Sequence, residues 1–230
     1  MNLNLVDIII LILILIGFTG GYKKGLIKQA VSTIGSIICV VAAFLFKNNL
    51  SIILYKKCPF FTIGLLKNYS SLNILLYELL AFFILLMIFS LILYILIKIS
   101  GIIERLLEDT ILLKFPAKLG GGLLGAIEMY IFCFIALLVL SLPLFSFSFN
   151  EEINNSLFAK KILNNTILIS NISRPLVRSL EGVNDLIKSK NDIGTKEFNC
   201  KSINLFKKNR IVTEESLEYL INNGKIDNEC

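Results

Sequence analysis

Three carboxyl side chains lie inside long apolar stretches of this sequence, and they are the side chains best placed to carry chemistry. Asp7 lies near the start of the first stretch, Glu78 near the start of the third, and Glu128 well inside the fourth. A carboxylate in an apolar medium is costly unless it is protonated or paired. Each of the three therefore needs a physical explanation.

The familiar catalytic constellations are absent from the sequence. The chain contains no histidine, which excludes histidine-dependent triads and zinc-protease helices. Gly20 and Gly25 have the spacing of a phosphate-binding loop, but Leu26 stands where that loop needs lysine. Cys39 and Cys133 lie in apolar segments, where a thiol usually serves as a small buried hydrophobe. We therefore predict no enzyme activity, no cofactor and no metal site.

The elements that hold these carboxyl groups are long apolar helices. The chain is 55% hydrophobic and only 17% charged, whereas soluble domains carry about 25% charged residues. Apolar runs of about 20 residues match the hydrocarbon core of a bilayer, and alternation typical of membrane strands is missing. The sequence predicts an all-α, polytopic membrane protein with four transmembrane helices, at about Leu5–Tyr22, Leu26–Phe46, Ile74–Ile97 and Leu119–Leu142.

Within a membrane the three carboxyl groups are expected to differ in role. Asp7 follows Asn4 by three positions at a helix start, where it can cap the first turn. Glu78 lies about one turn into its run, within reach of the outer interface, and is expected to be structural. Glu128 lies deeper, and intramembrane ionisable groups mark candidate functional sites. A functional role and a partnered structural role both stay open for Glu128.

Glu128 is expected to be neutral for most of the time and to have a specific polar partner, because a bare carboxylate at this depth is unfavourable. The candidate partners are the hydroxyls of Ser32 and Ser36 on the small-residue second helix. Lys28 is a third candidate, if its side chain reaches inward from the end of that helix.

Glycines recur at four-residue spacing in the first and fourth helices. Small residues at this spacing let helix backbones approach closely in a membrane. Near the first turn, glycine can equally serve a positive backbone φ, so turn and packing both stay open for Gly21 and Gly25. The predicted packing glycines are Gly17, Gly21, Gly25, Gly35, Gly121 and Gly125.

The lysines near the first turn predict the orientation of the chain. Lys23, Lys24 and Lys28 follow the first helix, and basic residues favour the cytoplasmic side. On this basis both termini lie outside, with seven basic residues in the two inside loops and six on the other side. Residues 1–149 carry a net charge of +5 and the remainder +1. Anionic lipid headgroups, rather than nucleic acid, are therefore the expected partners of the positive charge.

A polar C-terminal extension, residues 150–230, follows the predicted transmembrane domain of residues 1–149. Leu176–Ile187 and Glu214–Ile221 are expected to be helical, with Thr213 as an N-cap; whether the extension is partly ordered or flexible stays open. In an oxidising compartment Cys200 and Cys230 could form a disulfide, with Cys58 as a competing partner.

Several of these stretches together resemble a known family. Val6-Asp7-Ile8-Ile9, the segment GYKKGLIKQ at residues 21–29 and the segment GGLLGAIEM at residues 121–129 are similar to the colicin V production protein (CvpA) family of bacterial inner-membrane proteins. The resemblance covers about residues 1–145. It implies an accessory or scaffold protein that supports toxin production or export and envelope integrity, without a defined reaction, and that binds other membrane proteins or itself. The alternative is a small oligomeric transporter or channel that uses Glu128.

Overall fold

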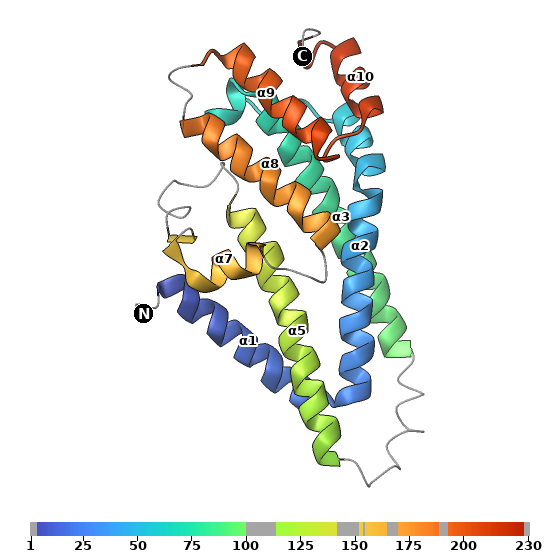
Figure 1. Ribbon diagram of the computed structural model, residues 1–230. Helices are drawn as coiled ribbons and strands as arrows, with labels where there is room; N and C mark the ends of the chain where they lie inside the picture. Colours follow the sequence, from blue (N-terminus) through green and yellow to red (C-terminus); the bar gives the residue numbers. More distant parts are fainter. Residues whose placement is uncertain are drawn as a thin grey trace. The chain divides into compact units, whose positions relative to one another are not determined.

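The computed structural model describes residues 4–99, 114–141, 152–153, 155–164, 170–188 and 193–227. These residues form helices, and the predicted fold class is confirmed. Four helices are long and apolar enough to cross a membrane: α1 (Leu5–Lys24), α2 (Leu26–Lys57), α3 (Ser70–Ile99) and α5 (Lys114–Leu140) (Figure 1). Shorter C-terminal helices follow them: α7 (Leu157–Asn164), α8 (Ser170–Lys188), α9 (Thr195–Lys208) and α10 (Glu214–Asn222).

Two of the long helices extend well beyond their apolar runs. The second run ends at Phe46, yet α2 continues through Lys47 to Lys57. At 1.5 Å per residue, the 32 residues of α2 span about 48 Å, more than the ~30 Å of a hydrocarbon core. Similarly, α3 begins at Ser70 rather than at Ile74. The short 3-10 helix η1 (Gly64–Lys67) lies in the connection between them.

The chain divides into two compact units, and the division runs through α2 and α3. Unit 1 comprises residues 1–42, 86–140 and 148–166, and unit 2 comprises residues 43–85, 141–147 and 167–230. The domain boundary that the sequence predicts, after residue 149, is based on the change from apolar to polar composition along the chain. The two units are defined by contacts in space, so their limits differ from this boundary. Unit 2 therefore combines apolar segments of α2 and α3 with the polar helices α8, α9 and α10, and α7 belongs to unit 1.

In unit 1, α1 packs against α5 through glycines. A Cβ atom added at Gly121 would lie 2.5 Å from the carbonyl oxygen of Gly21, and one added at Gly17 would lie 2.6 Å from that of Gly125. Such distances leave room only for hydrogen, so the backbones approach as closely as small residues allow. Gly25 ends α1 with a φ of 81°, which is the left-handed region that favours glycine. The structure thus places Gly21 in the packing. Gly25 serves the turn and the packing, because its carbonyl carbon would lie 2.6 Å from a Cβ added at Gly121.

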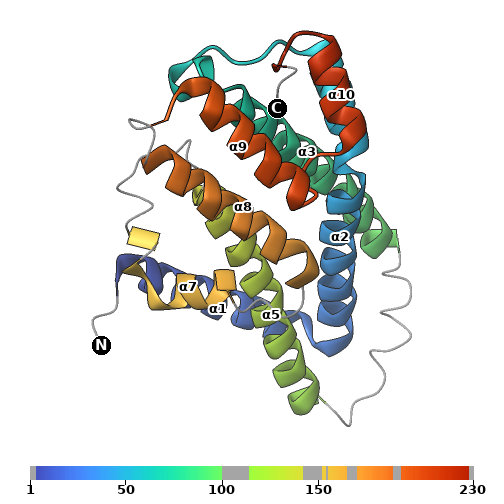
Figure 2. The same cartoon turned by 45° about the horizontal axis from the view of Figure 1, so that its top comes forward.

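In unit 2, the C-terminal helices are attached to the ends of α2 and α3. Lys225 donates hydrogen bonds to the Tyr55 carbonyl in the last turn of α2 and to the Cys58 carbonyl just after it, the latter at 3.1 Å. The Asn199 carboxamide oxygen accepts from the backbone N–H of Ser71 at 3.2 Å and so caps the start of α3. Figure 2 shows α10 beside the end of α2, and α9 beside the start of α3. Helices α9 and α10 are therefore a folded part of unit 2, whereas α7 belongs to unit 1.

Candidate functional site around Glu128

Glu128 lies near the middle of α5, and one face of α2 supplies its surroundings. Gln29, Ser32, Thr33 and Ser36 recur at three- and four-residue spacing in the first turns of α2, and this spacing places them on one side of a helix. All four belong to unit 1, as Glu128 does. Their side chains form what we call the Glu128 cluster.

The two carboxyl oxygens of Glu128 accept hydrogen bonds from uncharged donors. The Ser36 hydroxyl lies 2.8 Å from Oε1, and the Ser32 hydroxyl lies 3.1 Å from Oε1 and 3.2 Å from Oε2. The carboxamide nitrogen of Gln29 donates to Oε2. Because these donors belong to α2 and their acceptor to α5, the cluster joins two helices of unit 1.

Thr33 completes the cluster from its buried side. Its hydroxyl accepts from the Gln29 carboxamide nitrogen at 3.2 Å and lies 3.3 Å from the carbonyl oxygen of Leu124. In double-mutant cycles, each hydrogen bond between membrane helices stabilises the protein by about 0.6 kcal/mol on average and by about 1.7 kcal/mol at most. A set of several such bonds therefore contributes on the order of 2 kcal/mol to the contact between α2 and α5.

The structure brings to Glu128 two of the three partners that the sequence suggests. Ser32 and Ser36 bind the carboxyl group, whereas Lys28 lies among the exposed side chains at the start of α2. Gln29 and Thr33 are missed, although both lie on the same helical face as Ser32 and Ser36. Extending the three- and four-residue periodicity one turn backward from Ser32 would have found Gln29.

Glu78 lies among buried partners in unit 2. It is 2% exposed and forms an ion pair with Lys47 at 2.5 Å, and it also accepts from Ser51 at 2.6 Å and Tyr55 at 2.9 Å. The sequence does not indicate these partners, because α3 begins earlier than the apolar run and because Lys47 belongs to α2 rather than to a loop. The Lys47 ammonium also donates to the Ile211 carbonyl oxygen.

Asp7 lies fully buried in unit 1, where it caps two helices. Its carboxylate accepts from the Asn4 backbone N–H at 3.0 Å, at the start of α1. It also accepts from the Ser156 hydroxyl at 2.5 Å and from the Phe158 backbone N–H at 2.9 Å, at the start of α7. The first cap follows from the local sequence. The second comes from a segment 149 residues away, which no local pattern indicates.

The remaining predicted positions lie apart from the Glu128 cluster. Lys23 and Lys24 form the last turn of α1, and Gly35 faces Leu93 of α3 within unit 1.

The cysteines form no part of the Glu128 cluster either. Cys58 has a free thiol. Cys200 lies in α9, but Cys230 lies outside the described residues, so their bond stays a prediction. Within the described ranges, no three histidine, cysteine, aspartate or glutamate side chains gather in a group that could hold a metal ion.

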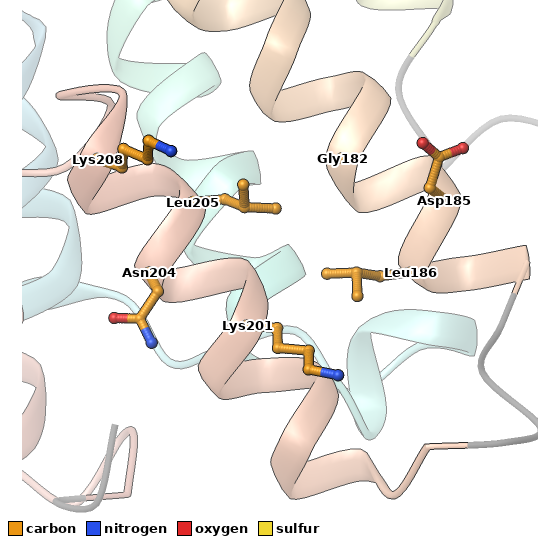
Figure 3. A pocket seen from close by; sticks show the side chains of 7 residues that line it. All are labelled: Gly182, Asp185, Leu186, Lys201, Asn204, Leu205 and Lys208. Carbon is orange, nitrogen blue, oxygen red and sulfur yellow. The ribbon is translucent and has the colours of Figure 1, made fainter.

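A groove between α8 and α9 is a concave feature of unit 2. Leu205 and Leu186 face each other across it, and Lys201 and Lys208 lie along its α9 rim (Figure 3). Lys201 pairs with Glu197 of its own helix at 2.6 Å. The groove is open and mainly apolar, so the Glu128 cluster remains the stronger candidate for a functional site.

Comparison with known proteins identifies similar sequences. The family model described as colicin V production protein matches residues 6–167. The uncharacterized transmembrane protein YshB of Bacillus subtilis (strain 168) is 30% identical over 177 residues, which cover 75% of this chain and 97% of that protein. No solved structure matches the chain.

Proposed function

The chain belongs to the colicin V production protein family, and from this premise we propose that it is a membrane accessory protein that supports toxin production or export and envelope integrity, without catalysing a reaction. It is a multi-pass membrane protein with four apolar helices. In this proposal the helices form a stable body that recruits other membrane proteins. The family's bacterial inner membrane is the proposed location.

The observation that carries this proposal is the way in which the three carboxyl groups of the long helices are bonded. Asp7, Glu78 and Glu128 each accept hydrogen bonds from a segment other than their own. Bonds of this kind hold segments in one arrangement, because breaking them leaves a polar group unpaired in an apolar region. Such an arrangement favours a scaffold over a moving pathway.

One observation favours the rival function, a small oligomeric transporter or channel. Glu128 is only partly buried within its chain, and uncharged hydroxyl and amide groups surround it. Polar intramembrane groups of this type line many ion and proton pathways. The two functions predict different results for the same variants.

The discriminating experiment combines Glu128→Gln and Glu128→Leu with crosslinking in native membranes and flux measurements in liposomes. A scaffold predicts that the Gln variant captures the same crosslinked partners as the parent, that the Leu variant is less abundant, and that no preparation shows flux. Ile127→Leu, at an exposed neighbouring position, is the matched control. Ion or solute flux by the parent that Glu128→Gln abolishes would establish the rival and refute the scaffold.

We further propose that both termini lie outside the cytoplasm. Lys23 and Lys24 end α1 and favour a cytoplasmic turn. Lys47, one of the six basic residues on the opposite side, is buried against Glu78 and does not act as a loop charge. The number of basic loop residues on that side is therefore five. Reporters fused after residue 30 should be active only in the cytoplasm and those fused after residue 150 only outside. Cytoplasmic activity of the second fusion would contradict this orientation.

A further inference from the structure

The Glu128 cluster contains one buried oxygen that lacks a partner. Gln29 is 2% exposed, and its carboxamide oxygen Oε1 finds no hydrogen-bond donor among the described residues. The nitrogen of the same carboxamide is fully used, because it donates to both Glu128 and Thr33. A buried polar atom without a partner is rare in folded proteins and calls for an explanation.

Rotating the Gln29 carboxamide by half a turn does not remove the shortage. Its oxygen would then face the Glu128 carboxylate, so that one acceptor would oppose another. Its nitrogen would take the buried position that lacks a partner. In either orientation one polar atom of the Gln29 carboxamide lacks a partner, and one small bound polar species would supply it.

The chemistry of the cluster indicates which species fits. Its polar atoms near Glu128 are mainly oxygens, from the carboxylate, from the Ser32 and Ser36 hydroxyls, and from the Gln29 carboxamide. A hydroxyl that donates its hydrogen still offers lone pairs to a cation. Carboxylate, carbonyl and hydroxyl oxygens are the ligands that replace the hydration shell of alkali-metal ions in membrane proteins.

We propose that the Glu128 cluster binds one alkali-metal cation of the sodium type, between the Glu128 carboxylate and the Gln29 carboxamide oxygen. A water molecule would satisfy Gln29 but leave the negative charge of the carboxylate balanced only by hydrogen bonds from Gln29, Ser32 and Ser36. A proton would remove that charge but leave Gln29 unsatisfied. A single monovalent cation does both. A divalent ion would leave an excess positive charge among apolar helices, which is unfavourable.

The bound ion has a structural role and needs no transport. It adds a contact between α2 and α5, which the cluster already joins. This inference goes beyond the accessory function and does not rest on it, because ion binding is measured on the purified protein without any partner.

Thermal unfolding of the full chain in neutral detergent provides the test. The parent is compared in sodium chloride, potassium chloride, lithium chloride and choline chloride at equal ionic strength. At a sodium concentration 100 times the dissociation constant, linkage predicts a melting temperature higher by roughly 5–10 °C than in choline. Equal melting temperatures in all four salts would overturn the proposal.

Variants locate the ion. Glu128→Gln removes the charge, and Gln29→Met removes the unpaired oxygen, so each should abolish the difference between sodium and choline. Thr19→Val is the matched control, because the Thr19 hydroxyl bonds only to the Ile16 carbonyl of its own helix within the described chain; it should keep the difference. A difference that persists in both cluster variants would place the ion elsewhere and refute the proposal. If either variant fails to fold, Ser36→Ala replaces it, with the same expected loss and the same refuting result.

Discussion

Breaking the buried ion pair of unit 2 should destabilise the protein far more than removing an exposed charge does. Glu78→Gln keeps the size of the side chain but leaves the Lys47 ammonium, whose side chain is 4% exposed, without its counter-charge. Only the Asn48 carboxamide and the Ile211 carbonyl remain among its described acceptors. Removing one partner of a buried pair costs about 3–5 kcal/mol, and we expect a loss of this size in the free energy of unfolding.

A second variant separates the charge from the packing. When both partners are replaced, in Lys47→Met with Glu78→Met, no buried charge remains, and such replacements are often neutral or stabilising. The Ser51 and Tyr55 hydroxyls, which donate to Glu78, then lose their acceptor at a cost of ~1–3 kcal/mol each. We expect the double variant to be more stable than Glu78→Gln only if the unpaired charge outweighs these two losses.

Unfolding by denaturant in mild detergent, followed by proteolysis of the C-terminal helices, measures both effects. The Ile211 contact links the ion pair to the turn before α10, so α9 and α10 should become sensitive to protease first. Glu218→Gln, an exposed carboxylate on α10, is the control and should change stability by less than ~0.5 kcal/mol. The reasoning fails if Glu78→Gln costs no more than this control.

Two further predictions follow from the glycine contacts and the cysteines. A Cβ at Gly21 would collide with the Gly121 carbonyl oxygen, whereas one at Gly20 meets nothing within 4 Å. Gly21→Ala should therefore lower the free energy of unfolding by ~1–3 kcal/mol. Gly20→Ala should be neutral or stabilise α1 by up to ~1 kcal/mol, and thermal unfolding measures both effects. If Cys200 and Cys230 are bonded, neither should react with a thiol reagent in non-reduced envelopes, and both should react after reduction; ready labelling without reduction would exclude the disulfide.

Local sequence is sufficient for the features that depend on one helix or on the bilayer. Apolar runs of bilayer length predict four spanning helices, because a helix crosses a fixed thickness at a fixed rise per residue. The need of Glu128 for a polar partner follows from the cost of an unpaired carboxyl group in lipid. The prediction that Ser32 and Ser36 bind Glu128 follows from the small-residue face of the second helix.

The sequence by itself therefore determined the membrane class, the family and the number of long helices, because each depends on local composition or on a continuous motif. Only the tertiary structure decided which distant groups meet. Lys47 reaches Glu78 across 31 residues, Ser156 reaches Asp7 across 149, and Lys225 reaches Tyr55 across 170. Periodicity indicates the face on which a side chain lies, but the partner opposite that face depends on where helices end and how they pack, and neither quantity is encoded in a local pattern.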